Sequence, residues 1–298
     1  MPTRRCFAET LLAATMLLLA PRAVTGAGAK RSSADKPGHW PPGYRGAVSL
    51  TYDDGLDSQL DIAVPQLDAR GLRATFFVTE SNIRSRMKDW VSVGRHGHEI
   101  ANHTVNHPCD LSHLQPTSFI EHEVAAMERW LDAQFGPGRP HTYAYPCDVT
   151  NLGPGTANAQ AERYAALLRQ TGITAARTSE GPPNSAHFVR HHPYRLQAFA
   201  IGYDSHDPTA LWRYLALAAR KNRWAILIIH DVVHRPRSQD EISARLHAHL
   251  LDAIAASPLW CAPLGEVFQR LMGAKGRPTE SHLSRPIAAG LAATHCTH

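Results

Sequence analysis

The feature that most constrains the fold is an alternation along residues 47–272 between short β-rich runs and longer segments with helical spacing. Ala47–Tyr52 and Ala74–Thr79 are two of the β-rich runs, and Leu60–Ala69 lies between them with apolar residues at helical spacing. Alternation of this kind is typical of parallel sheets, in which a helix connects each strand to the next. About seven such units in roughly 225 residues favour a closed or nearly closed barrel, with a doubly wound open sheet as the alternative.

The same pattern places further elements along the chain. Strands are also expected at 99–103, 142–145, 174–178, 224–230 and 260–262. Helices are expected to end at His96 and to cover 118–135, 159–170, 209–220, 241–255 and 264–272. Ser118 and Glu121 predict a capping box at the start of the helix that ends at Phe135.

Two adjacent carboxylates, Asp53 and Asp54, close the first expected strand. Such a pair is unfavourable unless a cation or a proton compensates the repulsion, so the pair indicates a functional site. Parallel α/β folds place their sites at this end of the strands. The alternative is the N-terminal turn of a helix, where Asp is common.

Histidines follow two other expected strands. His103 and His107 are four residues apart, so on a helical turn they can face the same way and share one metal ion. Together with one carboxylate and open coordination positions, two imidazoles suit Zn, Fe or Co. His230 ends the very apolar run Leu227–Ile229, which has little reason to end in an imidazole unless that group faces a site. An incidental HxxxH and a surface His-Asp cap are the alternatives.

Together these motifs resemble those of the polysaccharide deacetylases of carbohydrate esterase family 4, the NodB-homology group. The T-[FY]-D-D-G motif appears as Thr51–Gly55, the H-[ST]-x-x-H motif as His103–His107, and the L-x-x-H strand end as Leu227–His230. The supporting segments that also match are Ala74–Val78 and Gly97–His103. The resemblance runs from about Ala47 to Met272. It implies a distorted (β/α) barrel of about seven parallel strands in a single catalytic domain.

The resemblance also implies a role for each site residue. A divalent metal, most often zinc with Co, Ni or Fe as alternatives, is expected to be held by Asp54, His103 and His107. The cation activates its water and polarises the acetyl carbonyl. Asp53 is expected to be the base for that water, and His230 the acid that protonates the leaving amine.

The third motif departs from the family pattern F-R-P-P-Y-G, because the corresponding stretch Tyr143–Asp148 reads YAYPCD. A backbone N–H near Cys147 is still expected to bind the oxyanion, with Tyr145 and Pro146 beside the substrate. The Arg that normally braces the catalytic Asp is missing, and Arg177 or Arg190 is a candidate to replace it. Two further residues are candidates for the Asp that tunes the acid His: Asp204 and Asp207.

Four cysteines remain after the N-terminal segment that carries Cys6 is removed, and an even number in an exported chain favours disulfides. Three pairings are possible. Cys109 follows the histidine motif, and Cys147 lies in a motif expected at the same site, so we favour Cys109–Cys147. No CxxC spacing exists, which argues against a zinc-thiolate site.

The N-terminus has the layout of a secretory signal over residues 1–29: Arg4 and Arg5, an apolar run from Leu11 to Ala20, and an Ala-x-Ala site at Ala27 and Ala29. The apolar run is too short for a membrane helix, although an uncleaved anchor is the alternative. Removal of this segment lowers the net charge from +5 to +3, which does not support nucleic-acid binding. We therefore expect export to the periplasm or beyond, a linker over 30–46 and a loose tail over 273–298.

The function expected from these residues is metal-dependent removal of N-acetyl groups from a polymer or oligosaccharide that contains N-acetylglucosamine. One alternative is an O-acetyl esterase that acts on xylan-like glycans. Another is a glycan-binding member of the same fold without activity, which the missing Arg would favour. The sequence does not distinguish the polymer, the native metal or the oligomeric state.

Overall fold

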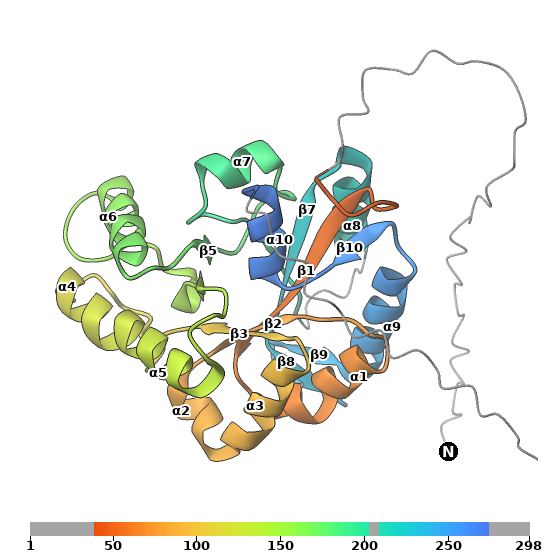
Figure 1. The fold of residues 1–298 in the computed structure, drawn as a ribbon, viewed down its shortest axis with the longest axis horizontal. Coiled ribbons are helices and arrows are strands. Elements are labelled where there is room, and N and C mark those ends of the chain that lie inside the picture. Colours follow the sequence, from red (N-terminus) through yellow and green to blue (C-terminus); the bar gives the residue numbers. More distant parts are fainter. Residues whose placement is uncertain (1–38, 203–208, 274–298) are drawn as a thin grey trace, which may run out of the picture. The chain divides into compact units, whose positions relative to one another are not determined.

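The computed structural model describes residues 39–202 and 209–273, and within them eight strands form one parallel sheet (Figure 1). The strands are β1 (Gly46–Asp54), β2 (Thr75–Val78), β3 (Glu99–Asn102), β4 (Thr142–Ala144), β5 (Ala175–Arg177), β6 (Phe199–Ala200), β7 (Trp224–Ile229) and β10 (Leu259–Cys261). Seven of them pair in the order β5-β4-β3-β2-β1-β7-β6, and β10 pairs with the first residues of β1. The expected distorted barrel of parallel strands is confirmed.

The segment between β5 and β6 brings the two outer strands together. Leu196 forms a parallel bridge with Arg177 at the end of β5, and three residues later Phe199 pairs with Leu227 of β7. Backbone bonds from Leu196 N to Ala176 O and from Thr178 N to Leu196 O support the bridge. The short strand β6 was not expected from the sequence, because it has only two residues.

The helical elements follow the strands and lie around the sheet (Figure 1). The α-helices are α1 (Val64–Asp68), α2 (Glu80–Ile83), α3 (Met87–Arg95), α4 (Pro116–Phe119), α5 (Ala126–Phe135), α6 (Ala157–Gln170), α7 (Ala186–His191), α8 (Thr209–Lys221), α9 (Ala244–Ala255) and α10 (Leu264–Leu271). Short π or 3-10 segments are η1 (Gln59–Ala63), η2 (Arg84–Arg86), η3 (Ile120–Ala125) and η4 (Pro146–Asp148). A separate two-stranded parallel sheet joins β8 (Asp231–Val233) to β9 (Glu241–Ser243).

Strand β1 lies at the centre of the fold because it pairs with three others, β2, β7 and β10. Its residues are buried from Gly46 to Asp53. Apolar side chains along β1 and β2 pack against the helices, and Tyr52 stacks on Phe76, which in turn meets Trp90 of α3 edge-on. Truncation of a buried aromatic such as Phe76 to alanine typically costs about 3–5 kcal/mol. This packing fixes the end of β1, where the two aspartates lie.

Three sequence-based expectations differ from the structure. The predicted capping box is wrong, because the helical segment begins at Pro116 and Ser118 lies inside α4. Proline at the first helical position already supplies the backbone angle that starts a helix. The helix expected from Glu241 begins at Ala244, because 241–243 form β9 and Ser243 caps the helix. The segment expected as a linker is partly folded, since Trp40 is 4% exposed.

Among the described residues, no helix is long and apolar enough to span a membrane. The expected signal segment and the tail beyond Gly273 lie outside the residues that the structure describes.

Candidate functional site

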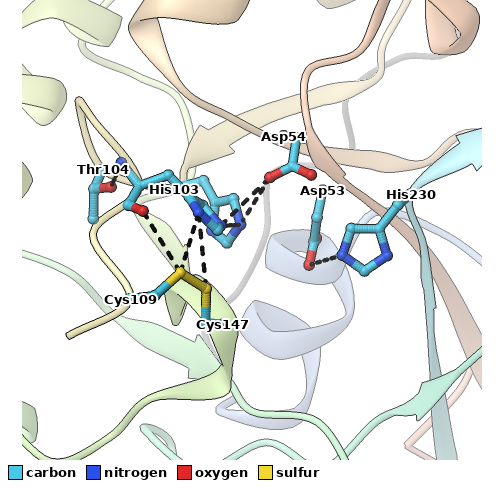
Figure 2. The surroundings of a disulfide bond; sticks show 8 residues. Asp53, Asp54, His103, Thr104, Cys109, Cys147 and His230 are labelled. Carbon is cyan, nitrogen blue, oxygen red and sulfur yellow. Dashed lines mark hydrogen bonds and ion pairs between the residues drawn. A yellow bond between two sulfur atoms is a disulfide. The ribbon is translucent and has the colours of Figure 1, made fainter. Parts of the chain in front are cut away.

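The motif residues gather at the carboxyl ends of four strands, as expected for a parallel sheet. Asp53 and Asp54 end β1, His103 follows β3, Cys147 lies in the turn after β4, and His230 follows β7. Figure 2 shows the carboxylate of Asp54 directed at the histidine pair and that of Asp53 directed at His230. The sequence-predicted residues are therefore close together in space.

The backbone at the end of β1 lets both aspartates serve one site. Successive side chains on a regular strand point to opposite faces, so adjacent residues would normally diverge. Asp54 departs from the strand with a φ of 77°, and Gly55 follows with a φ of 76°. A Cβ at Gly55 would approach Ile83 Cγ2 to 2.5 Å, so both conformation and space require glycine here.

Three donor atoms converge in the arrangement of a metal site. Asp54 Oδ1 lies 3.6 Å from His103 Nε2 and 3.5 Å from His107 Nε2, and the two nitrogens are 3.1 Å apart. A tetrahedral ion with bonds of about 2.0–2.1 Å places its ligands about 3.3 Å from each other. The donor set and its spacing therefore fit a small divalent cation such as zinc.

His103 is held in the form that a metal ligand needs. It is 2% exposed, and its Nδ1 donates to the Ala144 carbonyl at 2.9 Å, which leaves Nε2 with a free lone pair. Burial lowers the pKa of His103 to about 4, although the nearby Asp53 carboxylate acts in the opposite direction. The imidazole is therefore neutral at physiological pH.

The histidine motif is a loop, and the expectation that it forms a helical turn is wrong. Thr104 and His107 have φ values of 69° and 55°, which break any helix. The loop is fixed by its own bonds instead: Thr104 N donates to Asn102 Oδ1 at 2.8 Å, and His107 N donates to Thr104 Oγ1 at 2.9 Å. Glu123 on η3 accepts from Asn106 N at 2.8 Å.

A disulfide joins this loop to the turn after β4. Cys109 and Cys147 are bonded, with their Cα atoms 5.4 Å apart, which is the favoured pairing of the sequence analysis. Their sulfurs lie 3.8 and 4.0 Å from His107 Nδ1 (Figure 2). The disulfide therefore packs directly against one of the candidate metal ligands. Among the described residues Cys261 has no disulfide partner, and Cys296 lies outside them.

Arg177, one of the two arginine candidates of the sequence analysis, pairs with Asp53. Its Nη2 donates to both carboxylate oxygens of Asp53, at 2.6 Å from Oδ1, and both side chains are almost fully buried. His230 Nε2 lies 3.9 Å from Asp53 Oδ2. Burial on its own would raise the pKa of Asp53, but the Arg177 charge, with smaller contributions from His103 and His230, leaves it below the usual value.

The turn after β4 offers one free backbone donor. Tyr145 N donates to Arg177 O and Asp148 N donates to Tyr145 O, whereas Cys147 N has no protein acceptor among the described residues. Tyr145 and Pro146, expected beside the substrate, are instead buried. The Tyr145 hydroxyl donates to Tyr194 O at 3.1 Å, so its side chain belongs to the core.

The structure does not place the remaining candidates from the sequence at the site. Arg190 is on α7 with no bond to Asp53, and Asp204 and Asp207 lie outside the described residues. Sequence reasoning missed Gln59, whose fully buried amide bonds the backbone of both Asp53 and His230. Glutamine carries no family or metal-ligand signature, so nothing in the sequence marked it.

A second group of metal-capable side chains lies away from this site: Glu128, Asp132 and His141. Here Arg139 already pairs with both carboxylates, with Glu128 at 2.5 Å and with Asp132 at 3.0 Å. His141 Nδ1 also contacts Glu128 Oε2 at 2.5 Å. This group is internally neutralised and is a poor cation site.

A polar pocket of about 350 Å³ lies at the loops after β4 and β5. Asp148, next to Cys147, and Thr178, next to Arg177, line it together with Phe188 and His192 of the α7 region. Its volume lies in the range of small-molecule sites.

Comparison with known proteins gives one family match. The sequence model described as Polysaccharide deacetylase matches residues 42–174. A curated relative from Bacillus sp, named gellan lyase, is 32% identical over 152 residues, which are 51% of this chain and 6% of that protein. A relative from Arthroderma benhamiae, named a peptidoglycan-N-acetylglucosamine deacetylase, is 38% identical over 80 residues, 26% of this chain and 18% of that protein. The chain thus spans a small part of both relatives.

Among solved structures, one from Mycobacterium smegmatis described as a polysaccharide deacetylase aligns with a TM-score of 0.55. The alignment covers 78% of this chain and 92% of that chain at 17% identity, which supports the likeness of fold. The family model covers the strands that carry both aspartates, both motif histidines and the Cys147 turn. Residues 42–174 of this chain are therefore similar to the polysaccharide deacetylase family.

Proposed function

We propose that this protein is a metal-dependent deacetylase that removes N-acetyl groups from a glycan containing N-acetylglucosamine. The observation that carries the proposal is the convergence of Asp54, His103 and His107 beside a buried Asp53–Arg177 pair. The name of the Arthroderma benhamiae relative supports the choice of an N-acetylglucosamine polymer. The polar pocket at the loops after β4 and β5 offers room for a neighbouring sugar. We also propose that residues 1–29 direct export.

The proposed mechanism assigns a task to each side chain. Asp54, His103 and His107 hold a divalent cation, most readily zinc, and that ion supplies water activation and polarisation of the acetyl carbonyl. Asp53 accepts the proton of the attacking water, and Arg177 keeps its carboxylate ionised and oriented. His230 donates a proton to the departing amine, and the Cys147 amide donates to the developing oxyanion. The products are acetate and a free amino sugar.

Acetate release tests this proposal directly. Chelator-stripped protein is incubated with N-acetylglucosamine oligomers, peptidoglycan or acetylated xylan, before and after addition of stoichiometric zinc, cobalt or nickel. We expect zinc-dependent acetate release from the amide substrates. Release from xylan alone would support an O-acetyl esterase, and sugar binding without metal-dependent turnover on any substrate would support a glycan-binding protein. Asp54→Ala is the matched variant and is expected to lose turnover and zinc binding together.

A further inference from the structure

The ladder between β1 and β7 stops just before Asp53 and His230, the two residues proposed as base and acid. The last registered pair is Tyr52 with Ile229, so Asp53 and His230 are the next residues on each strand. From there β1 continues in register with β2, while β7 has ended. No ladder pair therefore joins Asp53 directly to His230.

Beyond the last ladder pair, the side-chain amide of Gln59 connects the two strand ends. Gln59 Nε2 donates to Asp53 O at 2.5 Å and to His230 O at 3.0 Å. A primary amide has two N–H donors, so a single group satisfies one carbonyl from each strand end. Gln59 is fully buried, and it is the first residue of the π-helical segment η1. Such π segments occur often at functional sites.

The residue before Gln59, Ser58, binds the two residues that follow His230. Ser58 Oγ donates to Asp231 Oδ1 and accepts from Val232 N at 3.3 Å. The backbone of His230 is therefore held from its own carbonyl and from the next two residues. The amide oxygen of Gln59, in contrast, is buried without a hydrogen-bond partner among the described residues. An unpaired buried oxygen is unfavourable, so stability alone does not explain glutamine at this position.

The geometry points to Gln59 as a positioning residue that sets the distance between the base Asp53 and the acid His230. The inference rests on the proposed function for the meaning of that distance. It does not involve the metal, because no described contact joins Gln59 to Asp54, His103 or His107. Loss of this bridge is therefore expected to impair proton transfer and to spare both substrate binding and metal binding.

The test compares Gln59→Met with Gln66→Met. Methionine has similar length but no donor. Gln66, on the neighbouring helix α1, is a matched control because its side-chain amide also forms two bonds. Its Nε2 donates to Ala244 O and its Oε1 contacts His247 Nδ1, and none of the described bonds joins it to Asp53 or His230. With zinc at saturation, we expect kcat of Gln59→Met to fall about 10–100-fold, since small displacements of reacting groups have effects of that size. KM and zinc affinity should change less than threefold, and Gln66→Met should keep kcat.

A second measurement does not depend on turnover. In wild-type protein labelled with carbon-13 histidine, the ring signal of His230 is identified by its absence in His230→Gln. We expect this signal to shift or broaden in Gln59→Met and to stay unchanged in Gln66→Met, where the His247 signal moves instead. An unchanged His230 signal in Gln59→Met, or equal loss of kcat in both variants, would overturn the inference. Absence of acetate release by the wild type would instead contradict the proposed function and leave the ring signals to decide.

Discussion

Two buried carboxylates in the same sheet, Asp53 and Glu99, have opposite kinds of partner: one is paired with a charged group and the other with neutral groups. Asp53, 4% exposed, lies one residue before the end of β1, and Glu99, 5% exposed, opens β3 at the other end of the sheet. Asp53 is paired with the guanidinium of Arg177. Within the described part of the chain, Glu99 accepts hydrogen bonds from neutral groups alone: Thr75 Oγ1 at 2.8 Å, Thr142 Oγ1 at 2.5 Å and Gly265 N at 2.8 Å.

The partners and burial shift the pKa values of the two groups in opposite directions. Burial would raise the pKa of Asp53, but Arg177 together with His103 and His230 lowers it, whereas burial raises the pKa of Glu99 and its hydrogen bonds offset this in part. Glu99 joins the barrel to the start of α10, because Gly265 is the second residue of that helix. Similar burial therefore accompanies a carboxylate that is paired with an arginine at one end of the sheet and another that holds the start of α10 at the other end.

The largest expected effect comes from Asp53→Asn. Removal of the proposed base should lower kcat about 10²–10⁴-fold. It also leaves Arg177 buried without a counter-charge, which should reduce the free energy of unfolding by roughly 3–5 kcal/mol. Acetate release with saturating zinc and urea denaturation measure the two effects. Glu99→Gln is the matched control and should keep kcat, so equal losses of kcat in both variants would break the comparison.

Substitution of Arg177, the positively charged partner of Asp53, should have the next largest effect. In Arg177→Met the pKa of Asp53 rises, because burial is no longer opposed by the adjacent charge. The acidic limb of the kcat/KM profile should then move to higher pH, and kcat at neutral pH should fall about 10–100-fold. Arg177→Lys keeps a positive charge and should shift the limb less. Profiles that coincide for all three proteins would exclude Arg177 as the group that keeps Asp53 ionised.

A smaller effect is expected at the other carboxylate. In Gly265→Ala the new Cβ would approach Glu99 Oε1 to 2.9 Å and Pro140 Cβ to 2.4 Å. Such overpacking typically destabilises by about 1–3 kcal/mol. We expect a lower unfolding midpoint in urea but unchanged kcat for the folded enzyme. A loss of kcat larger than the loss of folded protein would show that the Glu99 end also serves catalysis.

The smallest expected effect is on the pH dependence of the unfolding free energy, to which Glu99 and Asp53 contribute with opposite signs. Because the folded pKa of Glu99 is raised, its contribution is complete below the ordinary value of 4.5 and is lost as pH rises through the folded pKa. The folded pKa of Asp53 is lowered, so its contribution is present above 3.8 and is lost as pH falls through the folded pKa. Each unit of displacement corresponds to about 1.4 kcal/mol. Unfolding free energies of the wild type and Glu99→Gln between pH 4 and 8 should converge or cross as pH rises, and a constant difference would contradict this sign.

Local patterns in the sequence predicted the sheet and most of the site. Apolar runs that end in Asp53 or His230 mark strand ends, and strand ends of a parallel sheet lie together, so distant motifs could be assigned to one site. The Cys109–Cys147 pairing followed from the same reasoning, and the structure has that bond.

The rest depends on contacts that sequence spacing does not encode. Arg177 comes from β5, one strand beyond the expected motif, and could be named only as one of two candidates. The HxxxH spacing suggested a helix, but positive φ values at Thr104 and His107 bring the rings together in a loop. The Tyr145 hydroxyl and the Gln59 amide form hydrogen bonds with residues that are distant in the sequence. The core position of Tyr145 and the bridge made by Gln59 could therefore not be predicted.

The central claim is that one cation is held by Asp54, His103 and His107 beside Asp53. Anomalous diffraction at the zinc edge from crystals of zinc-loaded protein tests it most directly. The account predicts one strong peak about 2.0–2.1 Å from Nε2 of both histidines, with Asp54 as a third ligand. A peak at Glu128, Asp132 and His141 instead, or no peak at saturating zinc, would contradict it.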